Sequence, residues 1–98
     1  MIVFISGPIA GVEDYRKKFK EAEDILLQRG HAVINPAGMD SVVRGSVEYD
    51  DMLKMDLKLL ECAEAICLLP GWENSKGARA ERARAKELRL TEMIGVDV

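Results

Sequence analysis

Cysteine and histidine are scarce in this chain, which has two cysteines and one histidine among its 98 residues. Cys62 and Cys67 have neither the paired spacing of a disulfide framework nor the histidine partners that a zinc site needs. We therefore expect no metal and no other cofactor. Free buried thiols are typical of a reducing environment, so the composition favours a cytoplasmic protein.

Long apolar runs and a strong excess of one charge are missing as well. No apolar stretch approaches the roughly 20 residues that a membrane span needs, and the first residues, MIVFISGP, resemble a strand and not a basic leader. The 14 Lys and Arg residues against 17 Asp and Glu residues give a net charge of -3. Such a charge offers no general attraction to nucleic acid or anionic membrane, so we expect neither partner.

The residues that are present are those of a globular protein. Hydrophobic residues make up 48% of the chain and charged residues 32%, proportions at which a chain buries a core and does not stay disordered. A length of 98 residues is enough for one modest core but not for a separate substrate domain. The sequence therefore predicts a single domain over residues 1–98.

Apolar runs alternate with amphipathic segments along the chain. The apolar runs predict strands over residues 2–6, 31–35, 64–69 and 93–98. Apolar residues at helical spacing predict helices over residues 13–29, 48–63 and 77–90. This alternation indicates an α/β fold in which helices cover both faces of a parallel sheet. Ligands in such folds bind at the carboxyl ends of the strands.

A glycine-containing loop, GPIAG over residues 7–11, follows the first strand. Its glycines and proline permit a tight turn with close backbone approach to a ligand. Two interpretations stay open at this point, a phosphate- or sugar-binding loop and an ordinary strand-to-helix turn. The loop is not a dinucleotide-binding fingerprint, because the third glycine is missing.

A second glycine turn, in the sequence PGWENSKGARAE, follows the third strand. Asn74 or Ser75 can cap the helix that begins near Gly77, and such a helix N-terminus is a natural place for an anion or a sugar. Trp72 offers either a face for stacking on a nucleobase or a hydrophobic lid over the turn. Because both loops follow strands of one parallel sheet, we expect them at the same edge.

Two carboxylates lie on helix stripes that are otherwise apolar. Asp56 shares a stripe with Leu53 and Leu60, and Glu81 shares one with Ala78. Burying an unpaired charge is costly, so these acids should face a partner or a ligand cavity. For Asp56 the alternative is an aspartate at the edge of the stripe that caps a neighbouring loop. Paired carboxylates suit glycosidic chemistry, in which one attacks and the other manages a proton.

Three parts of the chain together resemble the nucleoside 2-deoxyribosyltransferase superfamily. They are FISGPIAG over residues 4–11, Asp56 on the second helix, and the spacing Ser75-x-Gly77-x-x-x-Glu81. The GPIAG and PGWENSKGARAE signatures look most like a branch of short phage and bacterial proteins that is classed as a domain of unknown function. The resemblance covers nearly the whole chain in the same order.

The resemblance implies a Rossmann-like, flavodoxin-like three-layer sandwich with a small parallel sheet of four to five strands. It implies cleavage of the N-glycosidic bond of a deoxynucleoside or its monophosphate, with Glu81 as the nucleophile that forms a glycosyl-enzyme ester. Asp56 would assist the leaving base or orient the site. Gly7, Ile9, Ser75 and Gly77 match positions that line the superfamily's sugar or phosphate pocket. We expect the substrate-binding residues to be these four together with Phe4, Pro8, Ala10, Gly11, Trp72 and Asn74.

The chain departs from the superfamily pattern in its first loop. Phe4 stands where active relatives often carry a tyrosine, and Pro8 and Ala10 replace the serine and arginine of the monophosphate-cleaving branch. The loop therefore offers less to a 5′-phosphate. Glu81 lies near a helix N-terminus, so we expect its ionised, nucleophilic form to be favoured. A small core and the superfamily's pockets at subunit contacts imply a homo-oligomer, a dimer or higher.

Three functions follow from this sequence. The first is a deoxyribosyltransferase or N-glycosidase that acts on a small nucleoside or nucleotide. The second is a non-catalytic nucleotide-binding or sensing module on the same fold. The third is an interaction protein that retains only the surface of the enzyme fold.

Overall fold

The computed structural model describes residues 1–95 as helices that flank a four-stranded sheet. The strands are β1 (Ile2–Ser6), β2 (Ala32–Ile34), β3 (Ala65–Leu68) and β4 (Thr91–Ile94). All neighbouring strands are parallel and their order is β2-β1-β3-β4. This is the strand order with which flavodoxin-like sheets begin. The α/β class predicted from the alternation of apolar and amphipathic segments is confirmed.

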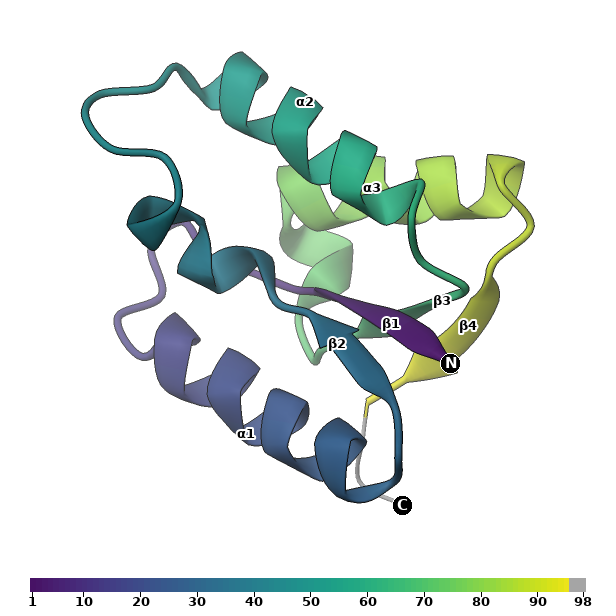
Figure 1. The fold of residues 1–98 in the computed structure, drawn as a ribbon. Helices are drawn as coiled ribbons and strands as arrows, with labels where there is room; N and C mark the ends of the chain where they lie inside the picture. The colour runs from purple at the N-terminus through teal and green to yellow at the C-terminus, as the bar shows by residue number, and fades with distance from the viewer. Residues whose placement is uncertain (96–98) are drawn as a thin grey trace.

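Three α-helices complete the sandwich. The helix α1 (Tyr15–Gln28) covers one face of the sheet, and α2 (Tyr49–Leu60) and α3 (Lys76–Glu87) cover the other (Figure 1). Two short 3₁₀ helices, η1 (Pro36–Ser41) and η2 (Trp72–Asn74), lie in the connections after β2 and β3.

The core has two halves because successive residues of a strand point to opposite faces of the sheet. On the α1 side, Val3 and Ile5 pack against Phe19. On the other side, Phe4 packs in a cluster that includes Leu60. Each of these side chains is at most 1% exposed. Burial on both faces explains why β1 and β3 are apolar runs without alternation.

The structure changes the predicted boundaries near the C-terminus. The third helix ends at Glu87, not at residue 90, because Arg89 adopts a left-handed backbone with φ of 59°. The backbone amide of Leu90 then donates a hydrogen bond to the Ala85 carbonyl oxygen at 3.0 Å, which caps the C-terminal end of the helix. The strand predicted over 93–98 begins earlier, at Thr91, and ends at Ile94; the rest of that prediction, residues 96–98, lies outside the described residues.

The two thiols differ in burial. Cys67 is buried in β3, where desolvation raises the pKa of its thiol to about 11. Cys62 follows the end of α2 and is exposed. The expectation of two buried thiols was therefore wrong for Cys62.

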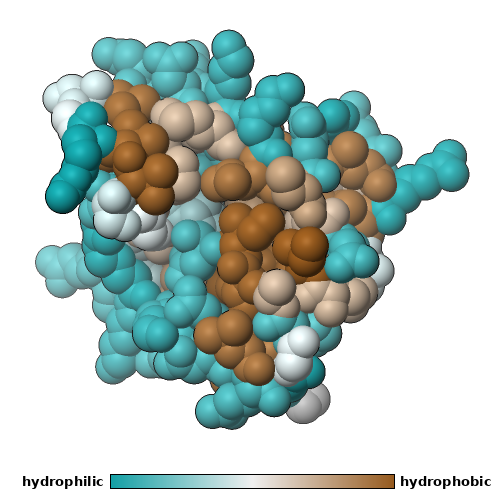
Figure 2. All heavy atoms as spheres, viewed as in Figure 1, coloured by the Kyte–Doolittle hydropathy of each residue, from teal (hydrophilic) through white to brown (hydrophobic). Residues whose placement is uncertain are grey.

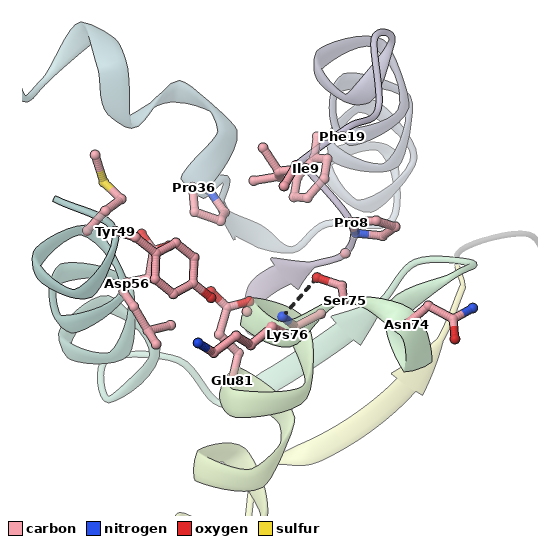
Figure 3. A pocket seen from close by; sticks show the side chains of 16 residues that line it. Pro8, Ile9, Phe19, Pro36, Tyr49, Asp56, Asn74, Ser75, Lys76 and Glu81 are labelled. Atoms are coloured by element: carbon pink, nitrogen blue, oxygen red, sulfur yellow. Dashed lines mark hydrogen bonds between the residues drawn. The ribbon is translucent and has the colours of Figure 1, made fainter. Parts of the chain in front are cut away.

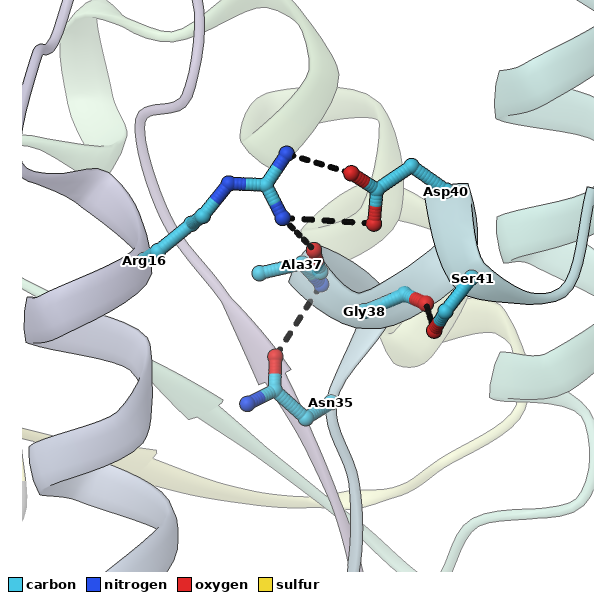
Figure 4. A network of polar contacts seen from close by, with 6 residues as sticks. All are labelled: Arg16, Asn35, Ala37, Gly38, Asp40 and Ser41. Carbon is cyan, nitrogen blue, oxygen red and sulfur yellow. Dashed lines mark hydrogen bonds and ion pairs between the residues drawn. The ribbon is translucent and has the colours of Figure 1, made fainter. Parts of the chain in front are cut away.

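A network of polar contacts ties α1 to the connection after β2, where the 3₁₀ helix η1 occupies part of the predicted loop (Figure 4). The guanidinium of Arg16 donates to both oxygens of Asp40, at 2.6 and 3.2 Å, and to the carbonyl oxygen of Ala37 at 3.3 Å. The side chain of Asn35 caps η1 by accepting from the Ala37 amide at 3.0 Å. This network holds Pro36 against the cavity described below.

The loops after β1 and β3 meet at one edge of the sheet, as predicted. A Cβ atom on Gly71 would lie 3.2 Å from Cγ of Pro8. β1 and β3 are neighbours although β2 comes between them in the sequence, so the chain changes direction across the sheet at this point. Such a switch point is where doubly wound folds bind ligands.

Candidate active site

A cavity of about 540 Å³ opens at this edge, between the loop after β1, the helix α2 and the start of α3 (Figure 3). This volume is in the usual range for sites that bind small molecules. Most of its wall is apolar, and its charged side chains are Asp56, Glu81 and Lys76. The two acids that the sequence predicted to point inward therefore share one cavity.

Glu81 is more deeply buried than Asp56. Glu81 is 6% exposed, and its neighbours on the inward face of α3 are the buried Ala78 and Ala85. The hydroxyl of Ser6, at the carboxyl end of β1, donates to Oε1 of Glu81 at 2.6 Å. Small alanines permit close approach of α3 to the sheet, and the glutamate reaches the end of β1 as a result.

Asp56 brings a second carboxyl group to Glu81 from α2. The residue is partly buried, and its Oδ1 is buried with no hydrogen-bond partner among the described residues. Desolvation raises the pKa of Asp56 from 3.8 to about 6, and the neighbouring Glu81 side chain contributes in the lowering direction. Desolvation likewise raises the pKa of Glu81 from 4.5 to about 8; Ser6 opposes this rise and Asp56 adds to it.

The two carboxyl groups titrate as a pair, and each step belongs to both residues. Between the two pKa values the pair holds one proton. The expectation that Glu81 is favoured in its ionised form was therefore wrong. Glu81 stands beyond the first turn of α3, where the helix dipole contributes little, and burial beside a second acid outweighs that contribution.

Most of the predicted substrate-binding residues lie in the cavity wall. They are Gly7, Pro8, Ile9, Ala10, Asn74, Ser75 and Gly77. Of the two candidates for the helix cap, Ser75 takes the role, because its hydroxyl accepts from the Ala78 amide at 3.2 Å (Figure 3). The side chain of Asn74 points away from Glu81 in the same view.

Three predicted site residues lie outside the wall. Phe4 is 0% exposed and belongs to the core on the α2 side of the sheet. Gly11 lies beyond the wall in a turn with φ of 76°. Trp72 packs against the core, and the guanidinium of Arg82 lies 4.8 Å from its ring centroid. The nucleobase platform that Trp72 could have supplied is therefore not found at this cavity.

Gly7 has a structural role in addition to its place in the wall. A Cβ atom on Gly7 would lie 2.9 Å from Cβ of Leu69, closer than real side chains approach. The glycine therefore lets the loop after β1 pack on the residue that follows β3. The loop is a tight turn and also lines the cavity, so phosphate or sugar binding by this loop stays a prediction.

Three residues with polar groups at the site were not predicted: Ser6, Tyr49 and Lys76. Ser6 is the one polar residue in the strand IVFIS, and that exception was the available signal. Tyr49 opens the apolar stripe of α2 and lines the cavity, with Lys76 Nζ 5.4 Å from its ring centroid. A Cβ atom on Gly77 would lie 3.3 Å from the Tyr49 hydroxyl, so Gly77 leaves room for that ring.

The remaining lining residues are apolar and supply shape more than chemistry. They are Phe19, Pro36, Met52, Leu53 and Ala78. Among residues 1–95, no group of three His, Cys, Asp or Glu side chains is arranged to hold a metal ion. The two carboxyls of this wall can together offer a nucleophile and a proton.

A search for membrane segments gave a negative result for the described part of the chain. None of its helices is long and apolar enough to cross a bilayer.

Comparison with known proteins identifies the fold and the family. No match to a curated protein was found. A solved structure described as a 2-deoxyribosyltransferase from the psychrotolerant bacterium Bacillus psychrosaccharolyticus, a biocatalyst for nucleoside synthesis, has the same fold, with a TM-score of 0.72 and 20% sequence identity over 96% of this chain and 71% of that chain. The fold expected from the superfamily resemblance is therefore confirmed. Residues 1–94 match the family model DUF4406, a domain of unknown function, and the chain belongs to that family.

Proposed function

We propose that this protein cleaves the N-glycosidic bond of a deoxynucleoside or its monophosphate. The observation that carries the proposal is the pair of carboxyl groups, Asp56 and Glu81, that line one cavity at the switch point of the sheet. Their raised pKa values let the pair hold one proton near neutral pH. Fold likeness to a 2-deoxyribosyltransferase supports it. Glycosidic bond cleavage commonly uses two carboxyl groups, one ionised as the nucleophile and one protonated as the acid.

In the proposed reaction the proton of the pair resides on Asp56 when substrate is bound. A carboxylate oxygen of Glu81 attacks C1′ of the sugar, and the bond from C1′ to the base nitrogen breaks. The electron pair of that bond goes to the base, which takes the proton from Asp56. Glu81 is then an ester of the sugar, and a second base or a water molecule attacks C1′ to release it.

The wall of the cavity suits a nucleobase on one side. Tyr49 is 49% exposed and is the wall's accessible aromatic ring, because Phe19 is 1% exposed. A stacked base gains on the order of 1–3 kcal/mol from such a ring. We therefore assign the platform role to Tyr49 in place of Trp72.

A substrate panel tests the proposal. Deoxynucleosides and their monophosphates are incubated with the protein, alone and with a second free base, and chromatography measures free or exchanged base. We expect turnover that Glu81→Ala lowers by at least about 1,000-fold. Glu87→Ala, at the exposed end of the same helix, is the control and should retain activity.

Mass spectrometry of the intact protein adds a direct readout of the intermediate. The wild type quenched during turnover should carry the added mass of one deoxyribosyl group, located on a peptide that contains Glu81. Turnover that survives Glu81→Ala would remove this residue from the nucleophile role. Absence of turnover on every member of the panel would contradict the proposed reaction.

A non-catalytic nucleotide-binding module is the second candidate. The observation that favours it is the deep burial of Glu81, whose raised pKa keeps the group protonated near neutral pH. This function predicts stabilisation by a nucleoside without product. Ligand at 100 times its dissociation constant would add about 2.7 kcal/mol to the free energy of unfolding, which thermal melting detects. No shift with any nucleoside or nucleotide would count against both functions.

A further inference from the structure

The buried hydroxyl of Ser6 donates a hydrogen bond to Glu81. The residue is 0% exposed, in a strand whose other members are apolar. Its Oγ donates to Oε1 of Glu81 at 2.6 Å, and the contact joins residues 75 positions apart. A short bond from a hydroxyl to a carboxylate is stronger than a bond between neutral groups, and it offsets the cost of burying the hydroxyl.

This bond acts on the charge of Glu81. Burial and the neighbouring Asp56 raise the pKa of Glu81, and the hydroxyl of Ser6 is the contact that lowers it. The hydroxyl therefore stabilises the ionised carboxylate that the proposed attack requires. It acts from the end of β1, a strand whose inner residues are wholly buried, so the donor is fixed before substrate arrives.

The same bond also orients the carboxyl group. Oε1 accepts the hydrogen bond from Ser6, which restricts rotation of the carboxyl group. A glutamate has three side-chain torsions, and fixing one oxygen removes much of the freedom that would otherwise be lost during the reaction.

We propose that Ser6 is a positioning residue for Glu81: its buried hydroxyl, 2.6 Å from Oε1, sets the orientation of the carboxylate and favours its ionised form. The inference rests on the proposed function, in which Glu81 is the nucleophile. It makes Ser6, Glu81 and Asp56 one unit, in which the hydroxyl stabilises charge on Glu81 while the proton moves to Asp56.

The first test needs no substrate. Carboxyl carbons are labelled with ¹³C, Glu81 is assigned by comparison with Glu81→Gln, and its titration is followed by NMR. Ser6→Ala should raise the titration midpoint of Glu81 by about one unit. Ser6→Thr keeps a hydroxyl and should stay near the wild type. Ser41→Ala is the matched control, since Ser41 also donates at 2.6 Å but to the Gly38 carbonyl oxygen on the surface.

The second test uses turnover. Ser6→Ala should lower kcat by roughly 10- to 100-fold with KM changed less than about twofold, and the acid limb of its pH profile should move to higher pH. Ser6→Thr should recover most of the rate. If the branched Thr does not fit the site, Ser6→Cys keeps an unbranched side chain with a weaker donor and should give an intermediate midpoint.

The outcomes separate the inference from the proposed function. A midpoint of Glu81 that stays unchanged in a folded Ser6→Ala protein, or a wild-type kcat in that variant, overturns the positioning role. A shifted midpoint in a protein that turns over no nucleoside supports control of Glu81 by Ser6 and contradicts the proposed reaction instead. Circular dichroism of each variant establishes that it is folded.

Discussion

The acidity of individual side chains in this protein is set by burial more than by their place on a helix. Glu81 and Asp56 lie in one cavity wall, and desolvation is the largest cause of the raised pKa of each. Glu87, on the last turn of the same helix as Glu81, is exposed and pairs with Arg84. Identical side chains on one helix thus have different chemistry, and the depth of each residue decides which is reactive.

The carboxyl pair predicts a bell-shaped dependence of kcat on pH. Below about 6 both groups are protonated and no nucleophile is present; above about 8 both are ionised and no acid is left. Activity should therefore be highest between these values. Initial rates across pH 4–10, at saturating substrate, check the profile. A single plateau that extends well above pH 8 would contradict a shared catalytic proton.

Asp56→Asn separates the roles of the two acids. The variant removes the proton donor and should lower kcat by roughly 100- to 10,000-fold for ordinary bases. It should also lower the pKa of Glu81, because Asp56 contributes to raising it. A 7-methylated purine base leaves without protonation, so its nucleoside should lose far less rate. Equal losses for both substrates would show that Asp56 does not supply the proton.

Tyr49 is expected to act on binding of the base. Tyr49→Ala removes the accessible ring of the wall and should raise KM by roughly 10-fold while kcat changes less. Tyr49→Phe keeps the ring and is the matched control. Steady-state kinetics with purine and pyrimidine nucleosides measure both constants. A loss in kcat alone, shared by Tyr49→Phe, would point instead to a role for the hydroxyl.

The elements of the fold depend on close backbone contact at the ends of the strands. Gly7→Ala would bring a Cβ atom within 2.9 Å of Cβ of Leu69, and overpacking of this kind costs about 1–3 kcal/mol. Urea unfolding should show that loss. Gly38→Ala, with nothing within 4 Å, is the control and should be nearly neutral. Because Gly7 also lines the cavity, an equal effect of both substitutions would leave only a binding role for it.

The order of the elements and the inward direction of both acids could be predicted from the sequence, because both depend on local periodicity. The apolar runs of β1 and β3 indicated a sheet covered on both faces, and the stripes of α2 and α3 placed Asp56 and Glu81 inward. The end of α3 could not be predicted, since it depends on a left-handed backbone at Arg89, a residue type with no preference for that conformation.

The parts of the site that were missed depend on packing between distant elements. Trp72 had the residue type of a base platform, yet the packing of η2 directs it to the core and to Arg82. In the sequence, Tyr49 is one more residue of the apolar stripe of α2. Its ring lines the cavity because α2 approaches Gly77. The contact of Ser6 with Glu81 spans 75 positions and has no local signature.

At the level of the whole molecule, assembly stays a prediction. The sheet ends in β2 on one side and β4 on the other, and apolar side chains are exposed in patches on the face that presents β2 (Figure 2). Large contiguous apolar patches are typical of surfaces that meet a partner, and the most exposed large apolar side chains of the described residues are Val42 and Ile94, at 74% and 65%. Light scattering at micromolar concentration should give the mass of a dimer or a higher oligomer; a mass near 10.9 kDa would contradict it.

The stability of the whole fold should depend on the carboxyl pair. Folding raises the pKa of Asp56 from 3.8 to about 6 and that of Glu81 from 4.5 to about 8. A carboxyl whose pKa is raised by folding favours the folded state most below its unfolded pKa. That contribution is lost as the pH rises through the folded pKa. The pair therefore makes the protein less stable between about pH 4 and pH 8 as the pH increases.

Glu81→Gln isolates this effect because the amide cannot ionise. Above pH 8 the variant should exceed the wild type in free energy of unfolding by on the order of 5 kcal/mol. The difference should shrink as the pH falls and vanish below about pH 3.5, because Glu81 is then protonated in both the folded and the unfolded chain. Urea unfolding at a series of pH values measures the difference, with Glu87→Gln as the exposed control. A difference that does not vary with pH would mean that folding leaves the pKa of Glu81 unchanged. A proton shared between Glu81 and Asp56 could then explain neither the pH dependence of stability nor that of activity.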